Sequence, residues 1–349
     1  MAEKILRQMQ SSYQAGDFDL KPNVITYNAV IKAWSQCRND PNAAHRAELY
    51  LRSMQRMYKE GNLDVKPDLF SFNAVLNAWA KSLKWEAVTR AGKILRYMEV
   101  QSENGGLDFA PNTVSYTAVI DAWAKSGCKN SGEVAEQLLI RMQEKFDRGE
   151  PTKPNLLTMN TVIDAHAKSS EKGKARNAQS VLRRIEAKYK EGDEQMLPNA
   201  FTYTTVLNAC AFTFEKSDQE EAFQVAQSTY QEVIKSASIR PTHLTYGTYI
   251  KAINTLLPRD DDRRYPLIES AFTQCCKDGQ LARFVLQCLQ DALPTQSYLK
   301  LLRGNRKGVV SVNAEDLPSE WRRNVKEKAL YFNQIREKKK VMKKRYRKR

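Results

Sequence analysis

The 349 residues are 42% hydrophobic and 28% charged, a balance that is typical of a folded protein. The net charge is +16 at pH 7, and residues 321–349 carry about +12 of it, so basicity mainly describes that end of the chain. No apolar run reaches the roughly 18 residues of a membrane span. The six Cys and three His show no zinc-ligand spacing. The sequence therefore excludes transmembrane and zinc-module classes.

Residues 1–23 are predicted to be the second half of a truncated repeat. Ala2 and Met9 lie seven residues apart, as Ala47 and Met54 do within a complete repeat. Apolar residues at this spacing share one face of a helix. We therefore expect the chain to open inside a second helix. Either the protein begins with a half repeat or, as we favour, this is a truncated product that lacks its upstream repeats and targeting segment.

A motif that begins Pro22-Asn23-Val24-Ile25-Thr26-Tyr27-Asn28 recurs along the chain. It returns after Pro67, Pro111, Pro154, Pro198 and Pro241. Counted from the second residue after each proline, the repeats start at intervals of 43 to 45 residues. A fixed period in this range is typical of a solenoid, in which each unit packs against its neighbours. The predicted repeats are 24–68, 69–112, 113–155, 156–199, 200–242 and a divergent 243–280.

Positions within a repeat are counted here from its first residue. Positions four, seven, eight and eleven are mostly apolar, which predicts a first helix of about 12 residues with one buried face. Position ten is always Ala, which allows neighbouring helices to approach closely, and position three is always Ser or Thr, which predicts an N-cap. With a second helix in each repeat, the sequence predicts an all-α, right-handed solenoid.

After the sixth repeat the pattern changes. Residues 258–264 are expected to form an exposed turn, with Asp260, Asp261 and Asp262 as solvated residues rather than a metal site. Residues 281–304 are predicted to form two short capping helices broken at Pro294. A linker over 305–320 and a basic tail over 321–349 complete the chain.

The first helix closely resembles that of a pentatricopeptide repeat, as Val24-Ile25-Thr26-Tyr27-Asn28-Ala29-Val30-Ile31 after Pro-Asn illustrates. The resemblance covers about residues 1–280. The repeats are about ten residues longer than the ~34 of related helical repeats, mostly late in the second helix or in the loop after it, which should alter the superhelical pitch. The resemblance implies single-stranded RNA binding at one base per repeat, without catalysis, cofactor or metal, in a mitochondrion or plastid.

The resemblance further implies that the fifth and last residues of a repeat read a base. The pairs are Asn28 with Asp68, Asn73 with Asn112, Thr117 with Asn155, Asn160 with Asn199, and the weaker Thr204 with Thr242, while Gly247 is silent. Ionised Asp only accepts hydrogen bonds and suits uracil or guanine, whereas Asn also donates and suits cytosine or adenine. In the family, Asn at position five favours pyrimidines and Thr favours purines. The predicted core is 5′-UCAC, although Asn or Asp after proline is also an ordinary turn or cap residue.

Two further sets of residues are candidates for RNA contact. By resemblance, position two stacks on the base, and here it is always apolar: Ile25, Phe70, Val114, Leu157, Phe201 and Leu244. Lys81, Lys125 and Lys168 share position thirteen and are candidate phosphate contacts. Lysines near helix ends are also common partners of the helix dipole, so this alternative stays open.

The sequence thus predicts a monomeric, sequence-selective RNA-binding protein that acts in organellar RNA processing, stabilisation or translation, with other RNA-processing proteins as potential partners. Two alternatives remain. The repeats could be a scaffold that holds a peptide on the position-two residues, or the basic tail could be the main binder, for instance of ribosomal RNA. His166 replaces Trp at position eleven and is predicted to be a core residue rather than a base or a metal ligand.

Overall fold

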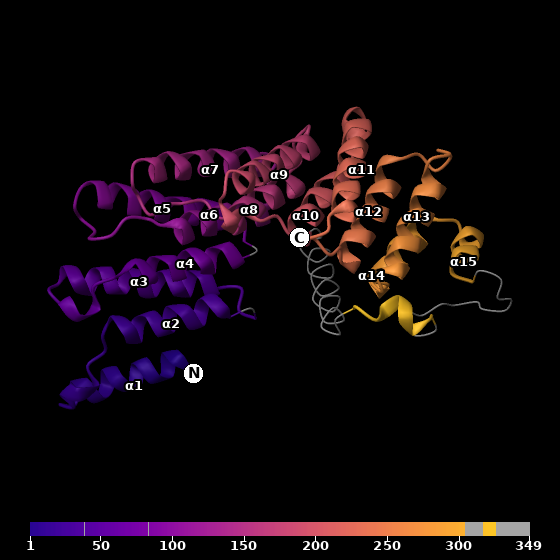
Figure 1. Ribbon diagram of the computed structural model, residues 1–349. Coiled ribbons are helices and arrows are strands. Elements are labelled where there is room, and N and C mark those ends of the chain that lie inside the picture. The colour runs from indigo at the N-terminus through magenta and orange to yellow at the C-terminus, as the bar shows by residue number, and fades with distance from the viewer. Residues whose placement is uncertain (38, 83, 304–316, 326–349) are drawn as a thin grey trace. The chain divides into compact units, whose positions relative to one another are not determined.

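A computed structural model describes residues 1–37, 39–82, 84–303 and 317–325 (Figure 1). Every regular element in these ranges is a helix, and within each unit the helices pack on their neighbours, so the predicted all-α solenoid is confirmed. The chain forms two compact units, Met1–Pro198 and a second that begins at Asn199. No helix within the described ranges is long and apolar enough to cross a membrane.

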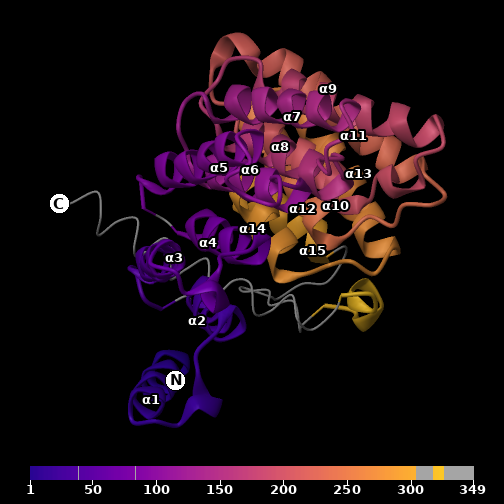
Figure 2. The same ribbon diagram turned by 90° about the vertical axis from the view of Figure 1, so that its left-hand side faces the viewer.

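The first unit contains four complete helix pairs preceded by a single helix. Its first helices are α2 (Val24–Gln36), α4 (Leu69–Lys81), α6 (Thr113–Ser126) and α8 (Leu156–Lys168). Its second helices are α1 (Ala2–Gln14), α3 (Ala43–Lys59), α5 (Ala87–Glu103), α7 (Ser131–Asp147) and α9 (Lys174–Lys190). Each first helix packs against the next first helix and against the second helices on either side of it (Figure 2).

The start of each first helix corrects one prediction from the sequence. The N-cap is not the Ser or Thr at position three but the residue just before position one, such as Asn23 or Asp68. Position three is the third helical residue, and its hydroxyl accepts a hydrogen bond from the backbone N–H of the cap. This reciprocal arrangement is a capping box, which satisfies two otherwise unpaired N–H groups.

The core of the first unit follows the predicted periodicity. Tyr27, Val30 and Ile31 are buried on α2, and the equivalent residues of α4 are buried in the same way. Position ten is buried at Ala78 but exposed at Ala33. We attribute this difference to the stacking direction, because no first helix of this chain precedes α2.

The additional length of the repeats lies in the second helices and the loops after them. Each of α3, α5, α7 and α9 has 17 residues. Gly61 and Gly192 follow two of these helices with φ near 100°, a left-handed conformation that glycine adopts without strain. Short 3-10 turns come next in three of the loops: η1 (Phe18–Leu20), η2 (Leu63–Val65) and η3 (Glu194–Met196).

Ion pairs join successive loops of the first unit. Lys21 Nζ lies 2.5 Å from Asp64 Oδ2, and Lys66 Nζ lies 2.8 Å from Asp108 Oδ2 in the loop that follows. The neighbouring lysine lowers the pKa of the Asp108 carboxyl. These pairs are solvent-exposed, so each contributes little to stability.

The second unit continues the alternation of first and second helices. It contains α10 (Ala200–Ala211), η4 (Lys216–Asp218), α11 (Gln219–Lys235), α12 (His243–Leu256), α13 (Arg264–Lys277), α14 (Arg283–Ala292) and α15 (Thr295–Arg303). α12 packs on α10, and α14 packs on α12. The helices α14 and α15 lie on either side of Pro294.

The turn after α12 is exposed over most of its length, as predicted, and only Arg264 at the start of α13 is buried. Asp261 forms an ion pair with Arg263, whose guanidinium lowers the pKa of that carboxyl. Arg264, by contrast, is buried and donates to the carbonyl oxygens of Leu257 and Ala292 at 2.8 Å. It therefore links the end of α12 to the end of α14.

Residues 317–325 return to the end of α13. Trp321 lies in the short 3-10 helix η6 (Ser319–Arg322). Its ring packs edge-on against the ring of Phe272 on α13, with 5.7 Å between the ring centroids. Arg323 donates to the carbonyl oxygen of Lys277 and Asn324 to that of Asp278. The predicted tail is therefore anchored at its root on the fold, whereas residues 326–349 and most of the predicted linker lie outside the described residues.

Candidate nucleic-acid interface

Within each of the two units, the apolar residues at position two are exposed at the start of the first helices, and they are called the position-two stripe here. The exposed fractions range from 46% at Phe70 and Leu244 to 72% at Ile25, with Val114, Leu157 and Phe201 between them. Side chains at position four, two residues further along each helix, are buried in the core. The stripe thus consists of apolar side chains that the fold leaves exposed to water. A repeated set of exposed apolar residues is typical of a binding surface rather than of ordinary helix starts.

Asn28 and Asp68, the predicted reading pair of the first complete repeat, are in direct contact. Asn28 Nδ2 donates to both carboxylate oxygens of Asp68, at 3.1 and 3.2 Å. Asp68 Oδ1 also accepts from the backbone N–H of Ser71 at 2.8 Å, because Asp68 caps α4. The capping oxygen is thus occupied, and Oδ2 is the acceptor that Asp68 can offer to a ligand.

Asn73 and Asn112 form the same contact in the next repeat. Asn73 Nδ2 donates to Asn112 Oδ1 at 3.2 Å. That oxygen also accepts from the backbone N–H groups of Val114 and Ser115, at 3.0 and 3.2 Å, because Asn112 caps α6. Backbone N–H groups can only donate, so the cap fixes the amide orientation and leaves the NH₂ group of Asn112 for a ligand.

The other predicted reading residues repeat parts of this arrangement. Asn155 Oδ1 accepts from the backbone of Thr158 and Asn199 Oδ1 from that of Thr202, so both present their NH₂ groups. Thr117 Oγ1 lies 2.8 Å from Thr158 Oγ1, and Thr204 Oγ1 lies 2.9 Å from Thr245 Oγ1. Asn160 is buried in the first unit, and Thr242 is the N-cap of α12 in the second.

Gly247 has a neighbour that sequence analysis did not identify. A Cβ atom at this position would lie 2.5 Å from the ring of Phe284 on α14. The ring therefore occupies the space that the Asn or Thr side chain has at position five of earlier repeats. No local sequence signal could reveal this, because Phe284 follows Gly247 by 37 residues, which departs from the repeat period, and its helix lacks the preceding proline motif.

The three candidate phosphate-binding lysines already have partners. Lys125 pairs with Asp121 and Lys168 with Asp164, four residues earlier on the same helix. Lys81 Nζ instead donates to the carbonyl oxygen of Ser35 at 3.2 Å. The partners of Lys125 and Lys168 are partly exposed, so these pairs are weak and exchangeable.

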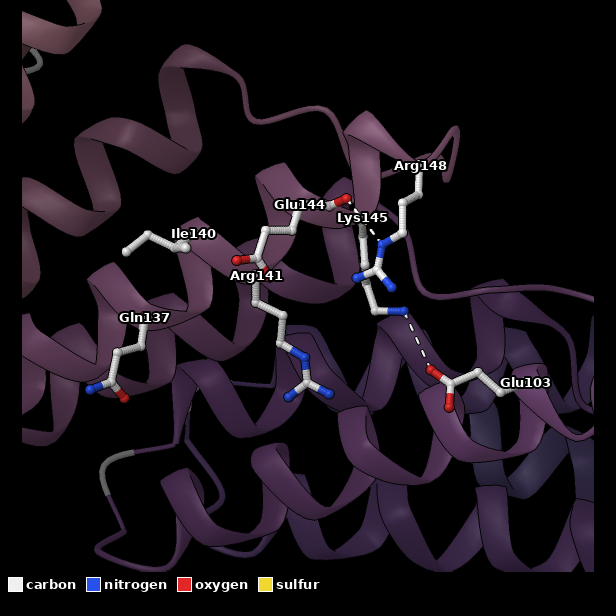
Figure 3. Close-up of a pocket in the computed structure, with 7 residues that line it drawn as sticks. All are labelled: Glu103, Gln137, Ile140, Arg141, Glu144, Lys145 and Arg148. Carbon is white, nitrogen blue, oxygen red and sulfur yellow. Dashed lines mark hydrogen bonds and ion pairs between the residues drawn. The ribbon is translucent and has the colours of Figure 1, made fainter.

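A cavity of about 400 Å³ lies elsewhere, along α7 (Figure 3). Its basic side chains are engaged by protein groups: Arg141 pairs with buried Glu99, Lys145 with Glu103, and Arg148 donates to the carbonyl oxygen of Glu144. This cavity is therefore not a preformed anion site. Over the described residues, no cluster of His, Cys, Asp and Glu could hold a metal ion.

His166 lies in the core of α8, as predicted, with 1% of its surface exposed. Burial lowers the pKa of its imidazole, although Glu136 and Glu171 oppose that shift. Its Nδ1 atom lies 3.3 Å from Glu171 Oε2. The ring is thus a packed, mainly neutral side chain rather than a group available to a ligand.

Residues 4–82 match the family model described as the pentatricopeptide repeat domain. This match identifies residues 4–82 as pentatricopeptide repeats. No curated protein matches the chain.

Solved pentatricopeptide repeat proteins share its fold. The crystal structure of the pentatricopeptide repeat protein PPR10 from maize matches with a TM-score of 0.53 at 19% identity, over 89% of this chain and 39% of that chain. The structure of PPR10 in complex with an 18-nt psaJ RNA element gives 0.30 at 17% identity, over 87% and 47%. The chain thus spans about two fifths of the first of these pentatricopeptide repeat structures.

Proposed function

We propose that this chain is a pentatricopeptide repeat protein that binds single-stranded RNA selectively, at one base per repeat, with a preferred core of 5′-UCAC. Its proposed role is the processing, stabilisation or translation of organellar RNA. The observation that carries the proposal is that each reading residue at the end of a repeat also caps a helix. The cap fixes which atoms that residue can offer to a base.

The chemistry of the caps matches the proposed bases. Asp68 offers a carboxylate oxygen, which suits the imino N–H of uracil, while Asn112 offers an NH₂ group, which suits the N3 acceptor of cytosine. Adjacent exposed side chains, such as Phe70 and Val114, supply apolar surfaces on which a base can stack. Capping and base reading are therefore compatible uses of the same residue rather than alternatives.

The Asn155→Asp variant tests the assignment of bases to repeats. Asp68 shows that Asp caps a first helix in the same way as Asn, so the fold should persist. The substitution replaces a presented NH₂ group with an acceptor, and we expect the third base preferred by the full chain to change from A to G. Binding to short RNAs that contain UCAC or UCGC would be measured at about 150 mM salt, where non-specific attraction is weakened. Each preference should be roughly tenfold.

Asn23→Asp is the matched control, because Asn23 caps α2 but no first helix of this chain precedes it. It should leave the preference for UCAC unchanged. Equal binding of UCAC, UCGC and a scrambled RNA by the wild-type chain would refute the proposed selectivity and favour a protein-binding scaffold or a non-selective tail.

Removing two acidic side chains should strengthen RNA binding. In the double variant Asp121→Asn and Asp164→Asn, Lys125 and Lys168 lose their partners and become available to phosphates. We expect an affinity gain of several-fold at low salt. The slope of log K against log salt should steepen by about 0.7 for each phosphate gained. A slope equal to that of the wild-type chain would show that these lysines do not contact phosphate.

A further inference from the structure

We infer that the position-three hydroxyl of one repeat orients the base-reading Asn of the repeat before it. Ser71 would position Asn28, and Ser115 would position Asn73. The specificity of a repeat would then depend on a third residue, which lies in the next repeat. This inference rests on the proposed function, since it concerns how the same pairs select a base.

The distances place each hydroxyl on the amide oxygen of the reader. Ser71 Oγ lies 2.6 Å from Asn28 Oδ1, and Ser115 Oγ lies 2.6 Å from Asn73 Oδ1. Both serines are completely buried, and the two Asn side chains are 8% and 9% exposed. These contacts are therefore shielded from water. A hydrogen bond is stronger in the protein interior than at the surface.

The opposite end of each reading amide is also fixed. Asn28 Nδ2 faces the carboxylate of Asp68, which can only accept, so this atom must be the nitrogen. With Oδ1 held by Ser71, the amide cannot turn over or rotate without breaking a bond at either end. The remaining N–H donor and the remaining oxygen lone pair of Asn28 therefore point in fixed directions. A fixed donor and acceptor are what discrimination between bases requires.

Thr26 provides an internal comparison. It occupies position three of α2, but no reading Asn precedes it, and its hydroxyl donates to the carbonyl oxygen of Asn23 in its own helix at 2.7 Å. Its capping bond is nevertheless the same, since the backbone N–H of Asn23 donates to Thr26 Oγ1 at 2.9 Å. Ser71 Oγ also lies 2.8 Å from Asp68 Oδ1, and Ser115 Oγ lies 3.2 Å from Asn112 Oδ1, so each hydroxyl has a second acceptor in its own cap. The contact with the reading Asn is the shorter one in both repeats, at 2.6 Å.

The test compares a pyrimidine with a purine that the last residue of the repeat accepts equally well. Any preference between the two bases then comes from the Asn at position five. Asp68 accepts from either uracil or guanine, so the affinity ratio of UCAC to GCAC isolates Asn28. Asn112 donates to either cytosine or adenine, so the ratio of UCAC to UAAC isolates Asn73. Both ratios would be measured for the full chain at about 150 mM salt.

In Ser71→Ala, we expect the first ratio to fall roughly fivefold, as for the loss of one neutral hydrogen bond, and the second to remain unchanged. Ser115→Ala should show the reverse. Ser71→Thr keeps a hydroxyl and should keep both ratios. Thr26→Ala loses the same capping bond as Ser71→Ala and should also keep both.

A wild-type chain that discriminates at both bases, with Ser71→Ala retaining its first ratio, would overturn the inference while leaving the proposed function intact. An equal fall of both ratios in Ser71→Ala and Thr26→Ala would also overturn it, because that result indicates loss of the cap. If the wild-type chain shows neither preference, the proposed function itself fails and the inference fails with it.

Discussion

Replacing Phe70 and Phe201 together with Ala is expected to weaken binding of an RNA that contains UCAC and the base after it by roughly two orders of magnitude. Stacking of a base on an aromatic side chain contributes about 1–3 kcal/mol, and each ring is proposed to meet a different base, so the two losses should add. The rings are 46% and 59% exposed in the free protein, so their removal leaves little or no cavity. Affinity should therefore fall while the melting temperature stays nearly constant.

Fluorescence anisotropy with a labelled RNA would measure the first quantity and circular dichroism the second. Phe18→Ala is the matched control, because this ring is 74% exposed but lies in the turn η1, away from the first helices. If Phe18→Ala weakened binding as much as the double variant, the position-two stripe would not be the stacking surface.

Trp79→Ala should destabilise the first unit by about 3–5 kcal/mol, the usual effect of emptying a buried aromatic site. Trp79 is fully buried at position eleven of α4. Its Nε1–H donates to Glu48 Oε2 at 2.8 Å, and Glu48 is itself buried on α3 of the preceding repeat. The substitution thus creates a cavity and removes one bond to a buried carboxylate.

Urea unfolding, followed by circular dichroism, measures this effect. Because each repeat of a solenoid contacts only its neighbours, we expect an early transition that involves part of the helices rather than a uniform shift. Trp85→Ala is the control, since that side chain is 86% exposed in the loop before α5 and should change stability by less than about 0.5 kcal/mol. A Trp79→Ala chain with wild-type stability would contradict the role assigned to Trp79 in the core.

The fold was largely predictable because its determinants are local and repeated. Apolar or aromatic residues equivalent to Tyr27, Val30 and Ile31 recur at helical spacing in every repeat, and each recurrence supports the assignment of a helix with one buried face. The N-cap was misassigned for a chemical reason. Ser and Thr are favoured both as N-caps and as the third residue of a capping box, so Ser71 alone does not reveal which role it has.

The candidate interface was predictable in composition but not in geometry. Sequence analysis selected Asn28 and Asp68 as a pair, yet it could not reveal that Ser71 holds the amide oxygen or that the cap sets which atom faces outward. Contacts between segments far apart in sequence were also beyond its reach. Two examples are the Phe284 ring, which packs against Gly247, and the Arg264 side chain, which is buried between two helix ends. Both depend on packing rather than on any local pattern.

If the last residue of a repeat both caps a helix and reads a base, as proposed, few amino acids can occupy that position. A residue that must cap a helix is restricted mainly to Asn, Asp, Ser and Thr, since other side chains lose about 1 kcal/mol of helix stability. Within that set, Asp offers an acceptor and capped Asn a donor, and there is little chemistry beyond these two. New target sequences would therefore arise mainly by exchange of Asn and Asp at sites such as Asn112 and Asn155, a change of a few atoms that leaves the scaffold intact.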